Sequence, residues 1–268
     1  MNVSEMQRKL SLRAEREPEH KFGSLHSLLY NEDWLRTAYE HVRQNAGKQT
    51  AGCDGMQMRS WEANLDHNQQ KLRTDLKAVT FEPCPVRRVY IRERKADGRT
   101  KVRPLGIATI RDRIVQEALR MILEPIFEAD FTRHSYGFRP GRSTKDAADY
   151  IMKRLTGRSR VAWVIEGDIE SYFDTINHRK LLHLLRRRIA DERLLALIWK
   201  FLRAGILEEG KLRASLTGTP QGGILTPLTQ RKRLIDGQDM ADGDFLGTGV
   251  HYDFLNQKAH EVFAFGKA

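Results

Sequence analysis

Apolar residues recur at helical spacing in several stretches of the chain. Residues 26–45 show this pattern, residues 58–78 read as another helix, and the stretch from Arg111 to Asp130 is the most regular. In that last stretch the apolar positions are Ile114, Val115, Ala118, Leu119, Ile122, Leu123, Ile126 and Phe127. The pattern predicts an amphipathic helix whose apolar side lies in the core, with Pro125 kinking it or starting a new turn.

The second half of the chain predicts three further helices, at about Thr144–Leu155, His178–Ile189 and Asp191–Ala204. Ser143 can cap the first of these, because Asp146 follows it three residues later. Helices therefore dominate the predicted secondary structure.

Two segments predict strands. The short apolar run from Val161 to Ile165 predicts a buried strand that ends in Glu166-Gly167-Asp168. The segment from Val86 to Ile91 has β character and opens a hairpin around a turn at Asp97-Gly98. Between Arg87 and Arg103 this hairpin holds eight basic residues against two acidic ones, a good shape for following a phosphate backbone.

Charge extends this picture to the whole chain. There are 46 basic and 35 acidic residues, a net charge of +11 and a pI near 9.8. Such a balance indicates a polyanionic partner, because basic contacts to phosphate release counterions; the alternative is an ordinary basic enzyme surface. The 40% of hydrophobic residues is enough to bury a core.

The N-terminus and the cysteines set further bounds. Residues 1–24 are highly charged and predict a mobile or partner-bound extension without the apolar core of a signal peptide. No long apolar run occurs elsewhere, so a soluble, cytoplasmic protein without membrane contact is expected. Cys53 and Cys84 form neither a CxxC pair nor a Cys/His spacing, which indicates neither a zinc site nor a disulfide framework.

Candidate chemistry lies at a strand end and in one loop. Asp168 follows the predicted buried strand, where a carboxylate can bind magnesium, although by itself a strand-end Asp more often caps a turn. The loop Ser135–Ser143 carries Arg139 and Arg142 beside a helix start. That loop is either an anion site or a simple structural turn.

Five segments, in this order along the chain, resemble reverse transcriptase motifs. They are Ala51–Gly55, Val102–Gln116 (without Ala108), Ser135–Ser143, Gly167–His178 and Gly218–Leu228, the last with its Pro-Gln-Gly. The chain is thus similar to reverse transcriptases of the group II intron type over roughly residues 30 to 228. The resemblance implies a truncated right-hand α+β fold, with helix-rich fingers and a small antiparallel palm sheet.

The expected domain organisation follows from the same resemblance. It has a charged extension at residues 1–24, fingers at 25–160, a partial palm at 161–228 and a divergent tail at 229–268.

The resemblance also implies roles for the palm residues. Asp168 would be a ligand to two catalytic Mg²⁺ ions, assisted by the carbonyl of Ile169. Phe173 would crowd a ribose 2′-hydroxyl and favour dNTPs, although outside this context it would be a core residue. Gln221 and Gly222 would lie against the incoming nucleotide.

In the fingers, Arg103 would grip the triphosphate through its bidentate guanidinium. Arg94 and Lys95 are both candidates for a second cation there. Arg139 and Arg142 would meet template or nucleotide phosphates. The implied reaction is two-metal nucleotidyl transfer with an RNA template such as intron RNA, a DNA primer and dNTPs, in a possible homo-oligomer.

The pattern changes after Leu228. The family continues with an apolar helix and a Tyr-Ala-Asp-Asp hairpin, whereas Thr229–Gly237 is polar and Ala241–Asp244 reads as a loop. We therefore hypothesise a reading frame truncated or shifted near residue 228, and a strand at Asp168 left with an unpaired edge. An incomplete polymerase is the first interpretation; a non-catalytic RNA-binding or splicing module, or an inactive remnant, is the alternative.

Overall fold

The chain divides into two compact units in the computed structural model. The first holds residues 1–129 and 173–235, and the second holds residues 130–172 and 236–268. The structure describes residues 2–94, 98, 100–137, 139–156, 163–168, 176–215, 217–218, 251–253 and 260–265. For residues 163–168, 251–253 and 260–265, and for Glu93, Lys101 and Arg103, it describes the backbone.

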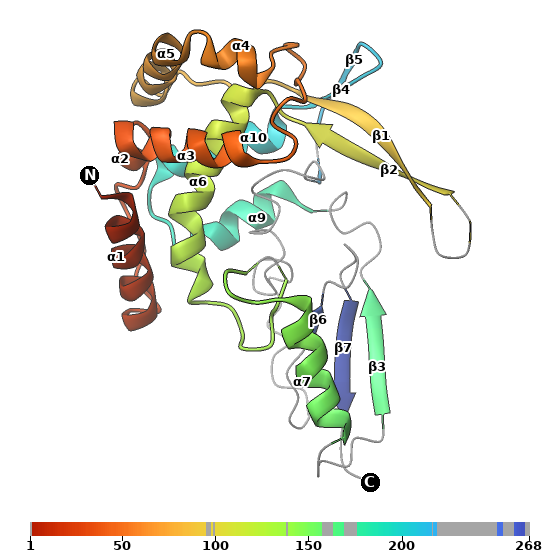
Figure 1. The fold of residues 1–268 in the computed structure, drawn as a ribbon. Coiled ribbons are helices and arrows are strands. Elements are labelled where there is room, and N and C mark those ends of the chain that lie inside the picture. The colour runs from red at the N-terminus through yellow and green to blue at the C-terminus, as the bar shows by residue number, and fades with distance from the viewer. Residues whose placement is uncertain are drawn as a thin grey trace. The chain divides into compact units, whose positions relative to one another are not determined.

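Helices make up most of the first unit (Figure 1). They are α1 (Val3–Arg16), α2 (His26–Leu29), α3 (Glu32–Gln44), α4 (Met58–Glu62), α5 (Leu65–Lys77), α6 (Ile110–Glu128), α9 (His178–Leu185) and α10 (Glu192–Arg203). Asn31, Thr109, Asn177 and Asp191 cap four of them by accepting hydrogen bonds from first-turn amides.

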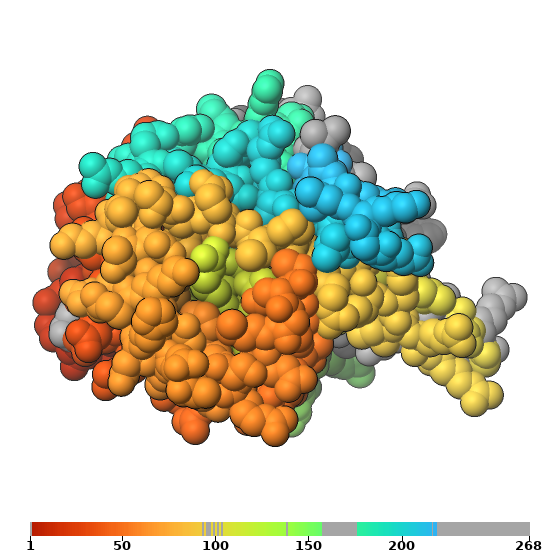
Figure 2. Space-filling view, turned by 90° about the horizontal axis from the view of Figure 1, so that it is seen from above, coloured from red at the N-terminus to blue at the C-terminus, as the bar shows by residue number. Residues whose placement is uncertain are grey.

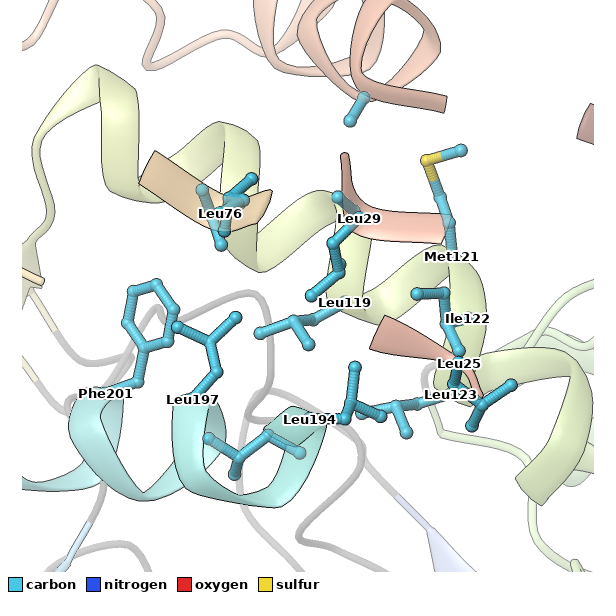
Figure 3. Packing of buried hydrophobic residues seen from close by; sticks show 14 of the residues in the cluster. Leu25, Leu29, Leu76, Leu119, Met121, Ile122, Leu123, Leu194, Leu197 and Phe201 are labelled. Carbon is cyan, nitrogen blue, oxygen red and sulfur yellow. The ribbon is translucent and has the colours of Figure 1, made fainter. Parts of the chain in front are cut away.

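Helix α6 is the centre of the first unit, with α1 and α3 packed against it. All eight apolar positions predicted for its inner side are buried, so that prediction is confirmed. Figure 3 shows its Leu119 in the same cluster as Leu29, Leu76, Leu194 and Leu197, which come from three other helices, α2, α5 and α10. The core thus joins the N-terminal helices to α9 and α10.

Pro125 lies inside α6 without ending it. Proline has no N–H, so the carbonyl of Met121, four residues earlier, loses its helical partner. The side-chain amide of Gln7 on α1 donates to that carbonyl at 3.0 Å. The N-terminal helix therefore supplies the hydrogen bond that the proline removes.

The N-terminal segment is docked on the rest of its own chain, so the mobile alternative predicted for it is wrong, while the partner-bound alternative stays a prediction. Leu10 and Ala14 of α1 are buried. After α1, the buried guanidinium of Arg188 donates to the carbonyls of Ala14, Glu17 and Pro18. Phe22 then exchanges backbone hydrogen bonds with the segment that follows α9. These contacts provide hydrogen-bond donors for the backbone carbonyls at the end of α1 from within the same chain.

A four-stranded sheet completes the first unit. It contains β1 (Val86–Arg94), β2 (Thr100–Ile107), β4 (Ile206–Glu208) and β5 (Lys211–Arg213) in the order β2-β1-β4-β5. The strands β1 and β2 form the predicted antiparallel hairpin, with Gly98 at φ +80° in its turn, and β4 joins β1 in parallel. The predicted hairpin is confirmed, within a mixed sheet.

The second unit holds α7 (Thr144–Thr156) and a three-stranded antiparallel sheet. Its strands are β3 (Trp163–Asp168), β6 (His251–Asp253) and β7 (His260–Phe265) in the order β3-β7-β6. Strand β3 pairs with β7 along its whole length, from Trp163↔Phe265 to Asp168↔His260. The tail therefore supplies a partner on one side of β3, whereas β3 is an end strand of the described sheet, so its other edge is unpaired there, as predicted.

Candidate nucleic-acid interface

The basic hairpin places a row of cationic side chains on one face. Strand alternation puts Arg88, Tyr90, Arg92 and Arg94 of β1 on the same side, opposite the side of Ile91. Tyr90 is 53% exposed, and Arg92 and Arg94 are also exposed. Figure 2 shows the hairpin extending away from the body of the first unit. We call these four residues the β1 basic face.

A neighbouring carboxylate orients the tyrosine of this face. The Tyr90 hydroxyl donates to Glu208 of β4, which also pairs with Arg213 at 3.1 Å. The hydrogen bond to Glu208 is the main cause that raises the pKa of Tyr90 and lowers that of Glu208. The ring is thereby fixed at the surface between arginines.

The loop containing Ala51–Gly55 is tied to the hairpin and to α6. Arg87 donates twice to the carbonyl of Ala51, at 3.1 and 2.7 Å. Arg113 of α6 donates to the carbonyls of Gly47 and Thr50. Gly52 lies so close to Thr109 that a Cβ at this position would be 2.6 Å from its Cα. Arg87 and Arg113 thus hold the loop in place by donating hydrogen bonds to its backbone carbonyls. This role depends on tertiary contacts and is not visible in the sequence.

Asp112 is a buried carboxylate that joins two segments of the fingers. It is 1% exposed, and its Oδ2 accepts from the amide of Cys84 at 2.9 Å. Its Oδ1 has no hydrogen-bond partner in the described part of the chain and lies 3.8 Å from Nε of Arg111. Burial is the main cause that raises the pKa of Asp112 to about 6.

A histidine joins the end of the Asp168 motif to the start of the Pro-Gln-Gly motif. His178 is 3% exposed, and its Nε2 lies 2.6 Å from the carbonyl oxygen of Gly218. The Gly218 amide donates to Ile176 at 2.9 Å, and its φ of +81° favours glycine. Trp199 packs edge-on against the imidazole. We call this arrangement the His178–Gly218 clamp.

In the second unit, the loop before α7 uses both of its arginines internally. Arg139 stacks on Phe131 and donates to the carbonyls of Thr132 and Ser135, both at 2.8 Å. Arg142 stacks on Tyr136 and donates to the carbonyl of Arg133. These contacts shape the loop, and the phosphate role of the two arginines stays a prediction.

The predicted cap of α7 is confirmed. The Asp146 carboxylate accepts from the Ser143 amide at 2.7 Å, while the Ser143 hydroxyl accepts from the Asp146 amide at 3.2 Å.

The remaining predicted site residues are placed only in part. Asp168 is the last residue of β3, and Arg103 pairs with Ile91 on the hairpin, each described by its backbone. Lys95, Ile169, Phe173, Gln221 and Gly222 lie outside the described residues. Among the side chains that the structure describes, no group of three His, Cys, Asp or Glu could hold a metal ion. None of the described helices is long and apolar enough to cross a membrane.

Comparison with known proteins identifies the family. A family model described as reverse transcriptase (RNA-dependent DNA polymerase) matches residues 93–234. Protein YkfC of Escherichia coli (strain K12) is 45% identical over 230 residues, which are 85% of this chain and 59% of that protein. Group II intron-encoded protein LtrA of Lactococcus lactis subsp. cremoris is 39% identical over 225 residues, 82% of this chain and 35% of that protein.

A relative from Saccharomyces cerevisiae gives the same result. The putative COX1/OXI3 intron 1 protein of Saccharomyces cerevisiae is 34% identical over 216 residues, 78% of this chain and 24% of that protein. The chain belongs to the reverse transcriptase family, in the branch of group II intron-encoded proteins. It spans between about a quarter and three fifths of the length of these relatives. The predicted resemblance and the α+β fingers and palm fold are confirmed.

Proposed function

We propose that this chain supplies the fingers and the first part of the palm of a group II intron RNA-directed DNA polymerase, and that it binds RNA through the β1 basic face. The observation that carries the proposal is the row of Arg88, Tyr90, Arg92 and Arg94 on one side of β1, where Arg88 is half-buried and the other three are exposed. Reverse transcriptases as a family take an RNA template, and the name of LtrA connects its branch to group II introns.

The geometry of the β1 basic face suits a nucleic-acid strand. Side chains on one face of a strand recur about every 6.8 Å, so Arg88 and Arg94 are about 20 Å apart along β1. That length spans several phosphates of one strand. The exposed ring of Tyr90 offers a stacking surface for a base, worth about 1–3 kcal/mol.

The nucleotide site is proposed from the motifs. Asp168 with the Ile169 carbonyl would face a divalent metal ion, Phe173 the sugar, and Gln221 and Gly222 the base and backbone of a dNTP. Arg103 would bind the triphosphate. Arg103 pairs with Ile91, so strand alternation places position 103 on the same face of the hairpin as Ile91. Position 94 lies on the opposite face, with Tyr90. We therefore assign Arg94 to RNA binding. Lys95 is then the second fingers cation.

The His178–Gly218 clamp supports the proposal that the Asp168 motif and the Pro-Gln-Gly motif belong to one nucleotide site. The His178–Gly218 clamp lies ten residues after Asp168 and three residues before Gln221 in the chain. It therefore holds the last residue of the Gly167–His178 motif against the first residue of the Gly218–Leu228 motif.

The metal site is incomplete in this chain. Two Mg²⁺ ions need several carboxylates, and Asp168 is the one that the family motifs supply here. Residues 229–268 contain no Tyr-Ala-Asp-Asp sequence. We therefore assign no metal-dependent step to this chain alone, and we propose RNA binding without DNA synthesis as its activity in isolation. A DNA primer, dNTPs, a homo-oligomer and a cytoplasmic location remain predictions for the complete polymerase.

RNA binding with and without the β1 basic face tests the proposal. Fluorescence anisotropy of a labelled RNA hairpin would be measured between 50 and 200 mM KCl. Changing Arg88, Arg92 and Arg94 together to Gln should weaken binding about tenfold at 150 mM salt and lower the salt slope by about 2 to 3. A control variant changes the exposed lysines Lys48, Lys71 and Lys77 to Gln, which removes the same charge. Equal binding by both variants would refute a role for this face.

A further inference from the structure

Helix α9 separates its side chains into two sets. Leu181, Leu182, Leu184 and Leu185 are buried in the core cluster. The exposed positions from residue 179 to 187 are all cationic or imidazole: Arg179, Lys180, His183, Arg186 and Arg187. No carboxylate interrupts this row, although acidic and basic residues alternate on the exposed sides of α1 and α3. We call these five residues the α9 basic face.

Helical geometry gathers the first three side chains on one side of α9, because Lys180 is the next residue after Arg179 and His183 lies four residues after it. Arg186 is the C-cap residue of α9, and Arg187 follows it in the turn after the helix. Four positive charges are thus concentrated on α9 and the turn that ends it. Figure 1 shows α9 beside α10 in the first unit.

Internal structure does not account for this row. Glu192 pairs with Arg186 at 2.9 Å, and Asp191 is engaged in capping α10. Arg179, Lys180 and Arg187 form no ion pair within the described part of the chain. The leucines hold α9 in place, whereas the charges of these three residues are not neutralised by any carboxylate in the described part of the chain.

We propose that the α9 basic face is a second RNA-binding surface, which contacts the phosphates of a structured RNA. The proposal rests on the proposed RNA-binding function and adds a surface on a different element from β1. Phosphate oxygens suit guanidinium and ammonium groups that hold no partner of their own. A membrane surface fits less well, because the apolar side of α9 is buried in the core and cannot insert among lipids.

The test compares a variant of this face with a variant of equal charge. Arg179, Lys180 and Arg187 are changed together to Gln in the full chain, and the lysine control at residues 48, 71 and 77 is used again. Anisotropy of a labelled RNA hairpin is measured from 50 to 200 mM KCl. We expect the Kd of the α9 variant to rise about tenfold at 150 mM salt and its salt slope to fall by about 2 to 3. The lysine control should stay within about twofold of the wild type.

Each other outcome overturns a defined statement. If the wild type binds RNA and the α9 variant matches the lysine control, the α9 basic face is not an RNA surface. If the wild type binds no RNA at all, the proposed function fails as well. If the α9 variant loses binding to phosphatidylserine vesicles while its RNA binding is unchanged, the face recognises lipid headgroups and the proposal is wrong. Circular dichroism with equal unfolding temperatures confirms that all variants fold.

Discussion

At the scale of single residues, Asp112 connects the start of α6 to the segment around Cys84, and its burial disfavours the charged form of its carboxylate. Its carboxylate accepts the Cys84 amide, and the Thr109 hydroxyl accepts the Asp112 amide at 3.2 Å. The burial that makes these bonds also disfavours the charged carboxylate, which is why its pKa rises to about 6. The folded protein therefore binds this proton more tightly than the unfolded chain does.

Replacing Asp112 with Asn should remove that pH dependence. Because the folded pKa is raised, the contribution of Asp112 to stability is fullest below about pH 4 and falls as the pH rises to about 6. The stability of Asp112→Asn relative to wild type should thus be about 1–2 kcal/mol greater at pH 8 than at pH 5. Urea unfolding at both pH values measures it.

The exposed Asp66→Asn variant is the control for this experiment, because Asp66 lies on the surface of α5. The same stability difference between Asp112→Asn and wild type at both pH values would show that Asp112 is not a buried, destabilised carboxylate.

At the scale of elements, the His178–Gly218 clamp connects two segments that carry family motifs. We predict that His178→Leu leaves the Gly218 carbonyl without a buried donor and costs about 1–3 kcal/mol of unfolding free energy. His178→Gln keeps an N–H donor and should recover part of that loss. Hydrogen exchange at the Gly218 amide should accelerate in the Leu variant and less in the Gln variant. Identical losses for Leu and Gln would show that the ring packs but does not clamp.

The sequence predicted the elements whose patterns are local. The apolar spacing of α6, the hairpin of β1 and β2 with Gly98 in its turn and the Ser143 cap of α7 are all confirmed, because neighbouring residues determine each of them. The docking of α1 escaped prediction. It depends on Gln7 reaching the carbonyl that Pro125 leaves unpaired and on Arg188 reaching carbonyls about 170 residues away. Such contacts between distant residues leave no periodic signal.

For the candidate site, too, the sequence predicted some features and missed others. The motifs located Asp168 at a strand end and Arg103 in the hairpin, and the family comparison supports the motifs. The internal contacts of Arg139 were not foreseen, since a loop arginine looks the same in the sequence whether it binds a phosphate or a carbonyl. The pairing of β3 with the tail strand β7 was not foreseen either, because the tail resembles no motif.

At the scale of the whole molecule, the proposed function combines RNA-binding surfaces with an incomplete centre for nucleotide transfer. The net charge of +11 is concentrated in part on the β1 basic face and the α9 basic face, which lie on separate elements of the first unit. One motif carboxylate, Asp168, is present without the Tyr-Ala-Asp-Asp partner. Affinity for RNA and synthesis of DNA should therefore be separable in this chain.

Primer extension tests this separation most directly. The purified chain and Asp168→Ala are incubated with an RNA template, an annealed DNA primer, dNTPs and Mg²⁺, at a protein concentration where anisotropy shows that the RNA is bound. We predict that the two proteins bind the RNA equally and that neither extends the primer. Extension by the wild type that is lost in Asp168→Ala would contradict the account, because it would show that this chain completes its own catalytic centre.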